Sequence, residues 1–164
     1  MAAAAACVLL ALPGTAHALK AGDPFPHFVA PDMSGAMIDT KAIGKKVIFI
    51  EFWSIYCSSC VAQMPHVVKM YDKLKDQGLQ CIGIDMDSYG VARVKKFLDG
   101  LEFKVTYPNI IDAKMQIKAL LGVSILPTTI VVDTTGKVAL FHVGYKPGFE
   151  VEMEEFVKKL LPGK

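Results

Sequence analysis

The chain has 164 residues, of which 52% are hydrophobic and 21% are charged, and its formal net charge is +2. This length fits one domain with a substantial core, and the composition is too apolar and too weakly charged for a disordered chain. A charge so close to neutral provides no basic surface for nucleic acid, and four cysteines are too few for a disulfide-built scaffold of this size.

The first residues have the pattern of a secretory signal. Residues 1–19 contain no Asp, Glu, Lys or Arg, and an apolar run at residues 2–12 is followed by Ala16-His17-Ala18. This small-residue pattern fits a signal-peptidase site, so we predict a secretory signal over residues 1–18. The alternative is an uncleaved membrane anchor, for which the run is short. Either outcome places the domain outside the cytoplasm.

Residues 19–164 are predicted to form one α/β domain. A continuous apolar run at residues 47–53 is typical of a strand buried on both faces, and hence of a parallel sheet. Apolar residues at three- and four-residue spacing from Val61 to Leu74 predict one face of a helix that ends at Gly78, and residues 81–86 predict a second buried strand. This order of strand, helix and strand makes a βαβ unit with a right-handed crossover.

The second half of the chain is predicted to continue with a helix, a short strand, a helix, two strands and a closing helix. These elements are placed at residues 91–98, 103–107, 115–121, 128–132, 138–143 and 153–161. Asp133-Thr-Thr-Gly136 is typical of a hairpin loop between the last two strands. We therefore predict a mixed central sheet with helices on both faces.

Two cysteines stand where the first buried strand gives way to a helix, in the sequence Cys57-Ser-Ser-Cys60. Sites in open α/β sheets form at this edge, beyond the carboxyl ends of the strands. At the start of a helix, Cys57 faces free N–H groups and the positive end of the helix dipole, which favour a thiolate. We predict a redox-active disulfide, with Cys57 as the nucleophile and the more buried Cys60 as the resolving cysteine.

Other roles for the cysteines are less consistent with their spacing. No second pair of cysteines or histidines follows at zinc-site spacing, and a disulfide between residues three apart removes little entropy from the unfolded chain. His27, His66 and His142 are scattered, so we predict no metal site and no cofactor. Cys81 stands within an apolar strand and is predicted to be an ordinary core residue.

Glu51 interrupts the apolar strand six residues before Cys57. A carboxylate is costly to bury unless it has a use or a partner. We predict that Glu51 accepts the proton of Cys60, with a pKa that burial raises. The alternative is a structural carboxylate that pairs with a lysine at the edge of the sheet.

The segment from Phe52 to Cys60 resembles the active-site segment of thioredoxin. Three further features narrow the match: Gly22-Asp-Pro-Phe-Pro-His-Phe28, Gly44-Lys45 and Gly122-Val-Ser-Ile-Leu-Pro-Thr-Thr129. Together with an insertion at about residues 88–121, they resemble the TlpA/ResA-like group of extracytoplasmic thiol-disulfide oxidoreductases. The resemblance covers nearly all of the domain.

The resemblance implies a thioredoxin fold with an N-terminal extension and an α-β-α type insertion. It also implies a cis peptide bond between Leu126 and Pro127 that faces the cysteines, where the backbone of Leu126 binds an extended client segment. Trp53 and Tyr56 are expected to line the same contact surface.

The family further implies reduction of client disulfides, with electrons from a membrane thiol transporter of the DsbD/CcdA kind, and we expect the protein to be a monomer. Apocytochrome c and the copper-site cysteines of oxidases are the expected clients. The alternatives are an oxidant of secreted thiols, a copper-delivery protein of the Sco type or a non-catalytic binding domain. A peroxidase is disfavoured, because Ile50 stands where the peroxiredoxin pattern has a proline.

Three residues depart from the family pattern. Tyr56 replaces a tryptophan before the first cysteine, and Ser59 replaces a proline in the dipeptide that tunes the reduction potential. Gln63 stands where ResA-like members often have a glutamate near the thiols, and an amide cannot take up a proton. Because Glu51 occupies the position of a buried aspartate in thioredoxin, the proton-accepting role is predicted to have moved there.

Overall fold

The computed structural model describes residues 19–163, so the predicted signal at residues 1–18 lies outside the described residues. Five strands form the central sheet: β3 (Val47–Trp53), β4 (Leu79–Asp85), β5 (Asn109–Ile111), β6 (Thr128–Val132) and β7 (Val138–Val143). Their order is β5-β4-β3-β6-β7. Strand β4 runs parallel to β3 and β5, whereas β6 runs antiparallel to β3 and β7. The predicted mixed sheet is therefore confirmed.

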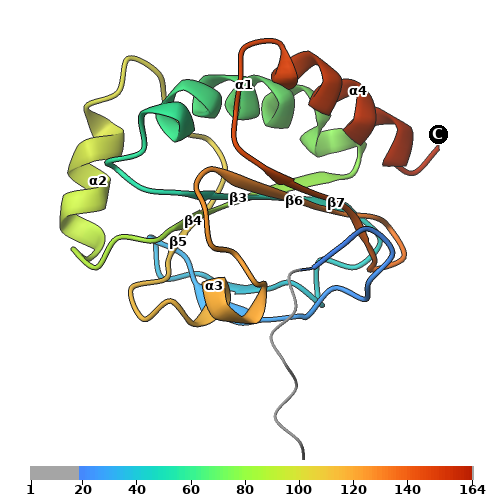
Figure 1. The fold of residues 1–164 in the computed structure, drawn as a ribbon, viewed down its shortest axis with the longest axis horizontal. Helices are drawn as coiled ribbons and strands as arrows, with labels where there is room; N and C mark the ends of the chain where they lie inside the picture. The colour runs from blue at the N-terminus through green and yellow to red at the C-terminus, as the bar shows by residue number, and fades with distance from the viewer. Residues whose placement is uncertain (1–18, 164) are drawn as a thin grey trace, which may run out of the picture.

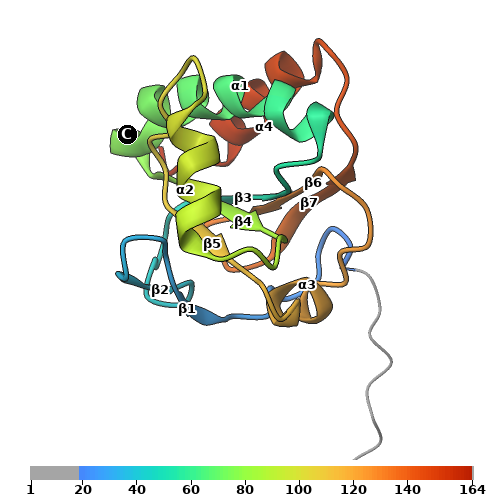
Figure 2. The same ribbon diagram turned by 90° about the vertical axis from the view of Figure 1, so that its left-hand side faces the viewer.

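Helices cover the sheet on both faces, as predicted. Helices α1 (Ser58–Leu74) and α4 (Phe149–Leu160) lie on one face, and α3 (Gln116–Leu120) lies on the other (Figures 1 and 2). The antiparallel pair β1 (Val29–Pro31) and β2 (Met37–Asp39) lies on the same side as α3. Helix α2 (Val91–Asp99) packs beside α1, and a 3₁₀ turn, η1 (Lys75–Gln77), follows α1.

The insertion has its α-β-α order, but the strand predicted at residues 103–107 is wrong. The observed strand, β5, begins at Asn109, two residues after the end of the predicted one. The side chains at residues 103–107 do alternate between inward and exposed, because the half-buried Phe103 and Val105 and the buried Tyr107 pack inward from an irregular segment. Pairing with β4 starts only after Pro108, whose carbonyl accepts a hydrogen bond from the Gly83 N–H at 2.9 Å.

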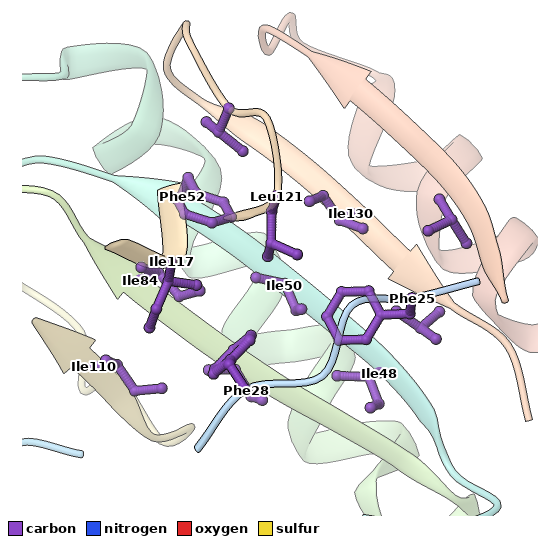
Figure 3. Close-up of a cluster of buried hydrophobic side chains, with 14 residues drawn as sticks. Phe25, Phe28, Ile48, Ile50, Phe52, Ile84, Ile110, Ile117, Leu121 and Ile130 are labelled. Atoms are coloured by element: carbon purple, nitrogen blue, oxygen red, sulfur yellow. The ribbon is translucent and has the colours of Figure 1, made fainter. Parts of the chain in front are cut away.

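Strand β3 divides the core into two layers. Ile48, Ile50 and Phe52 point toward α3 and the N-terminal extension, where Figure 3 shows them among buried apolar side chains. The alternate residues of β3, which include Glu51 and Trp53, point toward α1 because successive side chains of a strand face opposite sides. All seven residues of β3 are buried. The period of this central strand therefore directs Glu51 toward the helix that carries the cysteines.

We predict that Gly83→Ala destabilises the fold. A Cβ atom on Gly83 would lie 2.0 Å from Oδ1 of Asn109, which accepts a hydrogen bond from Trp53 Nε1 at 2.9 Å. Relieving such a clash in a packed core costs about 1–3 kcal/mol in free energy of unfolding, measured by urea denaturation. Gly163→Ala is the control, because nothing lies within 4 Å of its added Cβ atom. Equal stability of the two variants would contradict the prediction.

Candidate active site

The two cysteines form a disulfide at the start of α1. Cys57 is the N-cap residue of this helix, and its Sγ accepts a hydrogen bond from the Cys60 N–H at 3.2 Å. Cys57 is half-buried, whereas Cys60 is completely buried, which confirms the predicted difference in exposure. An attacking thiol has to reach a partner and a resolving thiol does not, so this geometry suits Cys57 to the first role and Cys60 to the second.

The loop that leads to Cys57 is anchored by a carboxylate that the sequence did not reveal. Asp87, just beyond the end of β4, accepts hydrogen bonds from Ser54 Oγ at 2.9 Å and from the Ile55 N–H at 2.8 Å. The Cys57 N–H in turn donates to the Ser54 carbonyl at 3.0 Å. An aspartate shortly after a strand parallel to β3 was the one available signal, since the two strands end at the same edge of the sheet.

A second carboxyl group lies next to Asp87. Asp85 ends β4, is completely buried, and accepts a hydrogen bond from the Asp87 N–H at 3.3 Å. Burial, together with the neighbouring Asp87 carboxylate, raises the pKa of Asp85 to about 8. Asp85 is therefore mostly protonated at neutral pH.

Glu51 is completely buried in the middle of the sheet, between Gly83 of β4 and Thr129 of β6. Its Oε1 accepts a hydrogen bond from the Tyr107 hydroxyl at 3.4 Å, and its Oε2 has no partner among the described residues. Burial raises the pKa of Glu51 to about 8, in the expected direction. No ion pair of Glu51 is found within residues 19–163, so the structure does not support the alternative of a lysine partner.

Gln63 connects α1 to the sheet beside Glu51. Its Nε2 donates a hydrogen bond at 3.1 Å to Oγ1 of Thr129, the residue that faces Glu51 across the β3–β6 ladder. Gln63 is buried, and its Oε1 has no partner in the described part of the chain. The Gln63 amide therefore makes a structural contact beside Glu51, and it cannot itself take up a proton.

The loop before β6 lies against the cysteines. The peptide bond between Leu126 and Pro127 is cis, as the resemblance implies. Leu126 packs against the buried cluster that contains Trp53 and Cys60, and Cys57 packs against the same cluster. Ile125, next to this bond, is 60% exposed, so the loop presents an apolar side chain to solvent beside the disulfide.

Of the two aromatic residues expected at the contact surface, one is exposed and the other is buried. Tyr56 is 65% exposed and accepts a hydrogen bond from Arg93 Nη2 at 2.8 Å, and the guanidinium of Arg93 lies over the ring of Tyr89. Trp53 is completely buried, so the expectation that it lines the surface is wrong. Its indole stacks on Phe97 and donates to Asn109, because the side chain falls on the inward face of β3.

The remaining candidate residues are dispersed. His27 lies by Thr40, His66 by Tyr145 and His142 by Phe149. Within residues 19–163, no group of three or more His, Cys, Asp or Glu side chains is arranged to hold a metal ion. Cys81 is a buried free thiol, and burial raises its pKa well above the usual value. In the same part of the chain, no helix has the length and apolarity needed to cross a membrane.

Known proteins share both the sequence and the fold. Residues 21–141 match the AhpC/TSA family. The thiol-disulfide oxidoreductase ResA of Bacillus anthracis is 31% identical over 144 residues, which cover 88% of this chain and 80% of ResA. ResA of Bacillus subtilis (strain 168) is 26% identical over 147 residues, which cover 90% of this chain and 79% of ResA.

A solved structure gives the same result. A crystal structure assigned as the thiol:disulfide interchange protein DsbE of Chlorobium tepidum matches with a TM-score of 0.81 at 28% identity, covering 88% of this chain and all of the other. The thioredoxin fold expected from the active-site segment is therefore confirmed. With its disulfide at the start of α1, this chain belongs to the AhpC/TSA family, as a thiol-disulfide oxidoreductase of the ResA-like kind.

Proposed function

We propose that the protein is exported and reduces disulfides of client proteins through Cys57 and Cys60, with Glu51 as proton acceptor. The observation that carries this proposal is the increasing burial of the site residues, from Cys57 through Cys60 to Glu51. A half-exposed Cys57 lies at a helix N-terminus, a buried Cys60 lies one turn inside, and a buried carboxyl group lies on the β3 face turned toward the same helix.

The reaction consists of two thiol-disulfide exchange steps. The Cys57 thiolate attacks one sulfur of the client disulfide, and the other client sulfur leaves as a thiolate that takes a proton from water. Glu51 then accepts the proton of the Cys60 thiol, and the new Cys60 thiolate attacks Sγ of Cys57. The second client sulfur leaves, the Cys57–Cys60 disulfide forms, and two electrons have passed to the client.

The surroundings of Cys57 favour the reducing direction. A couple becomes a strong oxidant when its reduced, thiolate form is strongly stabilised. In this protein the Cys60 N–H and the Ser59 hydroxyl lie 3.2 Å and 3.5 Å from the Cys57 sulfur, and the two residues between the cysteines are uncharged serines. The nearby Glu51 adds no positive charge. The Cys57 thiolate is therefore stabilised by the helix N-terminus and these hydrogen bonds, but by no cationic side chain between the cysteines, and this moderate stabilisation supports a reductase.

Clients would bind beside the disulfide. The backbone of Leu126 supports strand addition by an extended client segment, which recognises main chain more than side chains. Pro127 fixes the end of that loop, and the exposed side chains of Tyr56 and Ile125 provide apolar contacts on either side of Cys57. Trp53 has a supporting role beneath this surface.

The cellular setting follows from the leader and the resemblance. We propose that residues 1–18 direct export, that a membrane thiol transporter of the DsbD/CcdA kind returns electrons to the disulfide, and that apocytochrome c cysteines are clients. The similarity to ResA and DsbE supports a client that is a protein thiol or disulfide.

The reduction potential of the Cys57–Cys60 couple tests the direction. We expect a value near that of thioredoxin, about −270 mV, because the Cys57 thiolate is only moderately stabilised. The measurement uses equilibrium with glutathione and dithiothreitol buffers in a Cys81→Ala background, which removes the third thiol. A value near −120 mV, about that of a strong oxidant, would reverse the proposed direction.

We expect Glu51→Gln to slow resolution of a mixed disulfide on Cys57 by about ten-fold or more above pH 8, since a general base is lost. Stopped-flow release of thionitrobenzoate from the mixed disulfide measures this step. Attack by Cys57 on the reagent serves as the internal control and is expected to change less. Rates identical to the wild type at every pH would show that Glu51 is only structural.

The same variant is expected to alter the pH dependence of stability. Folded Glu51 has a pKa of about 8 against 4.5 for the ordinary side chain, so between these values the folded state binds more protons than the unfolded state. Glu51 therefore lowers the free energy of unfolding as pH rises across this window, by at most about 1.4 kcal/mol per pH unit. Urea denaturation at pH 5 and pH 8 should show a smaller decline in Glu51→Gln than in the wild type.

A further inference from the structure

The hydroxyl group of Tyr107 is the one hydrogen-bond donor found for Glu51 among the described residues. The other ionisable side chain that faces this position is Cys81 on β4, and Tyr71 of α1 packs against Tyr107. No cation is among them. Among the described residues, the stabilisation of an ionised Glu51 therefore depends on a single neutral hydrogen-bond donor.

Tyr107 is held in place from two sides. Its ring is 4% exposed and meets the ring of Tyr71 edge to face, with centroids 6.2 Å apart. Its main-chain carbonyl accepts a hydrogen bond from Asn109 Nδ2 at 3.1 Å, and Oδ1 of the same amide accepts the bond from Trp53. The hydroxyl is therefore fixed relative to β3, the strand that also carries Glu51.

We propose that Tyr107 is a positioning residue for proton transfer in disulfide exchange: its hydroxyl holds Oε1 of Glu51, so that Oε2 is left to take the proton of Cys60. This role rests on the proposed function of Glu51. Oε2 is the carboxyl atom without a partner in the described chain, which is the condition an incoming proton requires.

The electrostatics of the pair agree with this role. Burial raises the pKa of Glu51, and the hydrogen bond from Tyr107 opposes that rise because it stabilises the ionised carboxylate. Burial, together with the negative charge of an ionised Glu51, raises the pKa of Tyr107 well above its usual value. Tyr107 therefore keeps its proton over the working pH range and remains a donor.

The test is Tyr107→Phe, which removes the hydroxyl and keeps the ring. We expect the pKa of Glu51 to rise by roughly 0.5 to 1 pH unit, the equivalent of one hydrogen bond. The titration is followed on the Glu51 side-chain carboxyl carbon by NMR. At pH 7 the resolution step should slow by about three- to ten-fold, and the two proteins should converge at high pH.

Tyr71→Phe is the matched control, because it removes the hydroxyl of the ring that packs on Tyr107 but no contact to Glu51. We expect it to leave both the Glu51 titration and the pH–rate profile unchanged. In wild-type protein, the Cζ resonance of Tyr107 should titrate with the pKa of Glu51, which tests the contact without any substitution.

Two outcomes separate this inference from the proposed function. If Glu51→Gln slows resolution but Tyr107→Phe matches the wild type in pKa and rate, Glu51 is the base and Tyr107 does not position it. If Glu51→Gln leaves resolution unchanged, the proposed base is wrong, and a shifted Glu51 titration in Tyr107→Phe would report a structural contact without a catalytic role. When both roles hold, Tyr107→Phe has no further effect on the rate in a Glu51→Gln background.

Discussion

The site depends on one constraint, the burial of a carboxyl group on the central strand. Strand β3 has a neighbour on each side and helices or loops on each face, so all seven of its residues are buried. At Glu51 this excludes bulk water and leaves, among residues 19–163, a single hydrogen bond to the carboxyl group. A carboxyl group with so little solvation stays protonated near neutral pH and gives up its proton only in a slightly basic range.

The parallel pairing of β3 with β4 assembles the rest of the site. Both strands end at the same edge of the sheet, with Trp53 opposite Asp85, so the loop to Cys57 and the loop after β4 emerge side by side. Asp87 then anchors the first loop through two hydrogen bonds. Cys57 consequently starts α1 from a fixed position, which a reactive sulfur needs if it is to meet both a client and Cys60.

Patterns of neighbouring residues predicted those features of the fold that depend only on neighbouring residues. The strands at residues 47–53, 128–132 and 138–143 have the predicted bounds, because uninterrupted apolar runs between turns leave little choice. The order of the two cysteines also follows from the helix start. Tyr107 and Asn109 could not be found this way, since their roles depend on β5 pairing beside β4. Alternation at residues 103–107 predicted a strand because an irregular segment that packs every second side chain inward has the same pattern.

Two buried acids on the same face of the sheet show how the energetic cost of burying carboxyl groups at the site is limited. Glu51 and Asp85 both have a pKa of about 8, so both carboxyl groups are largely neutral at pH 7. Their environments nevertheless differ. Asp85 shares its surroundings with the Asp87 carboxylate, so its ionisation would place two negative charges together. Glu51 has a neutral hydroxyl donor instead. Of the two, Glu51 is therefore the acid that ionises without a carboxylate as a direct neighbour.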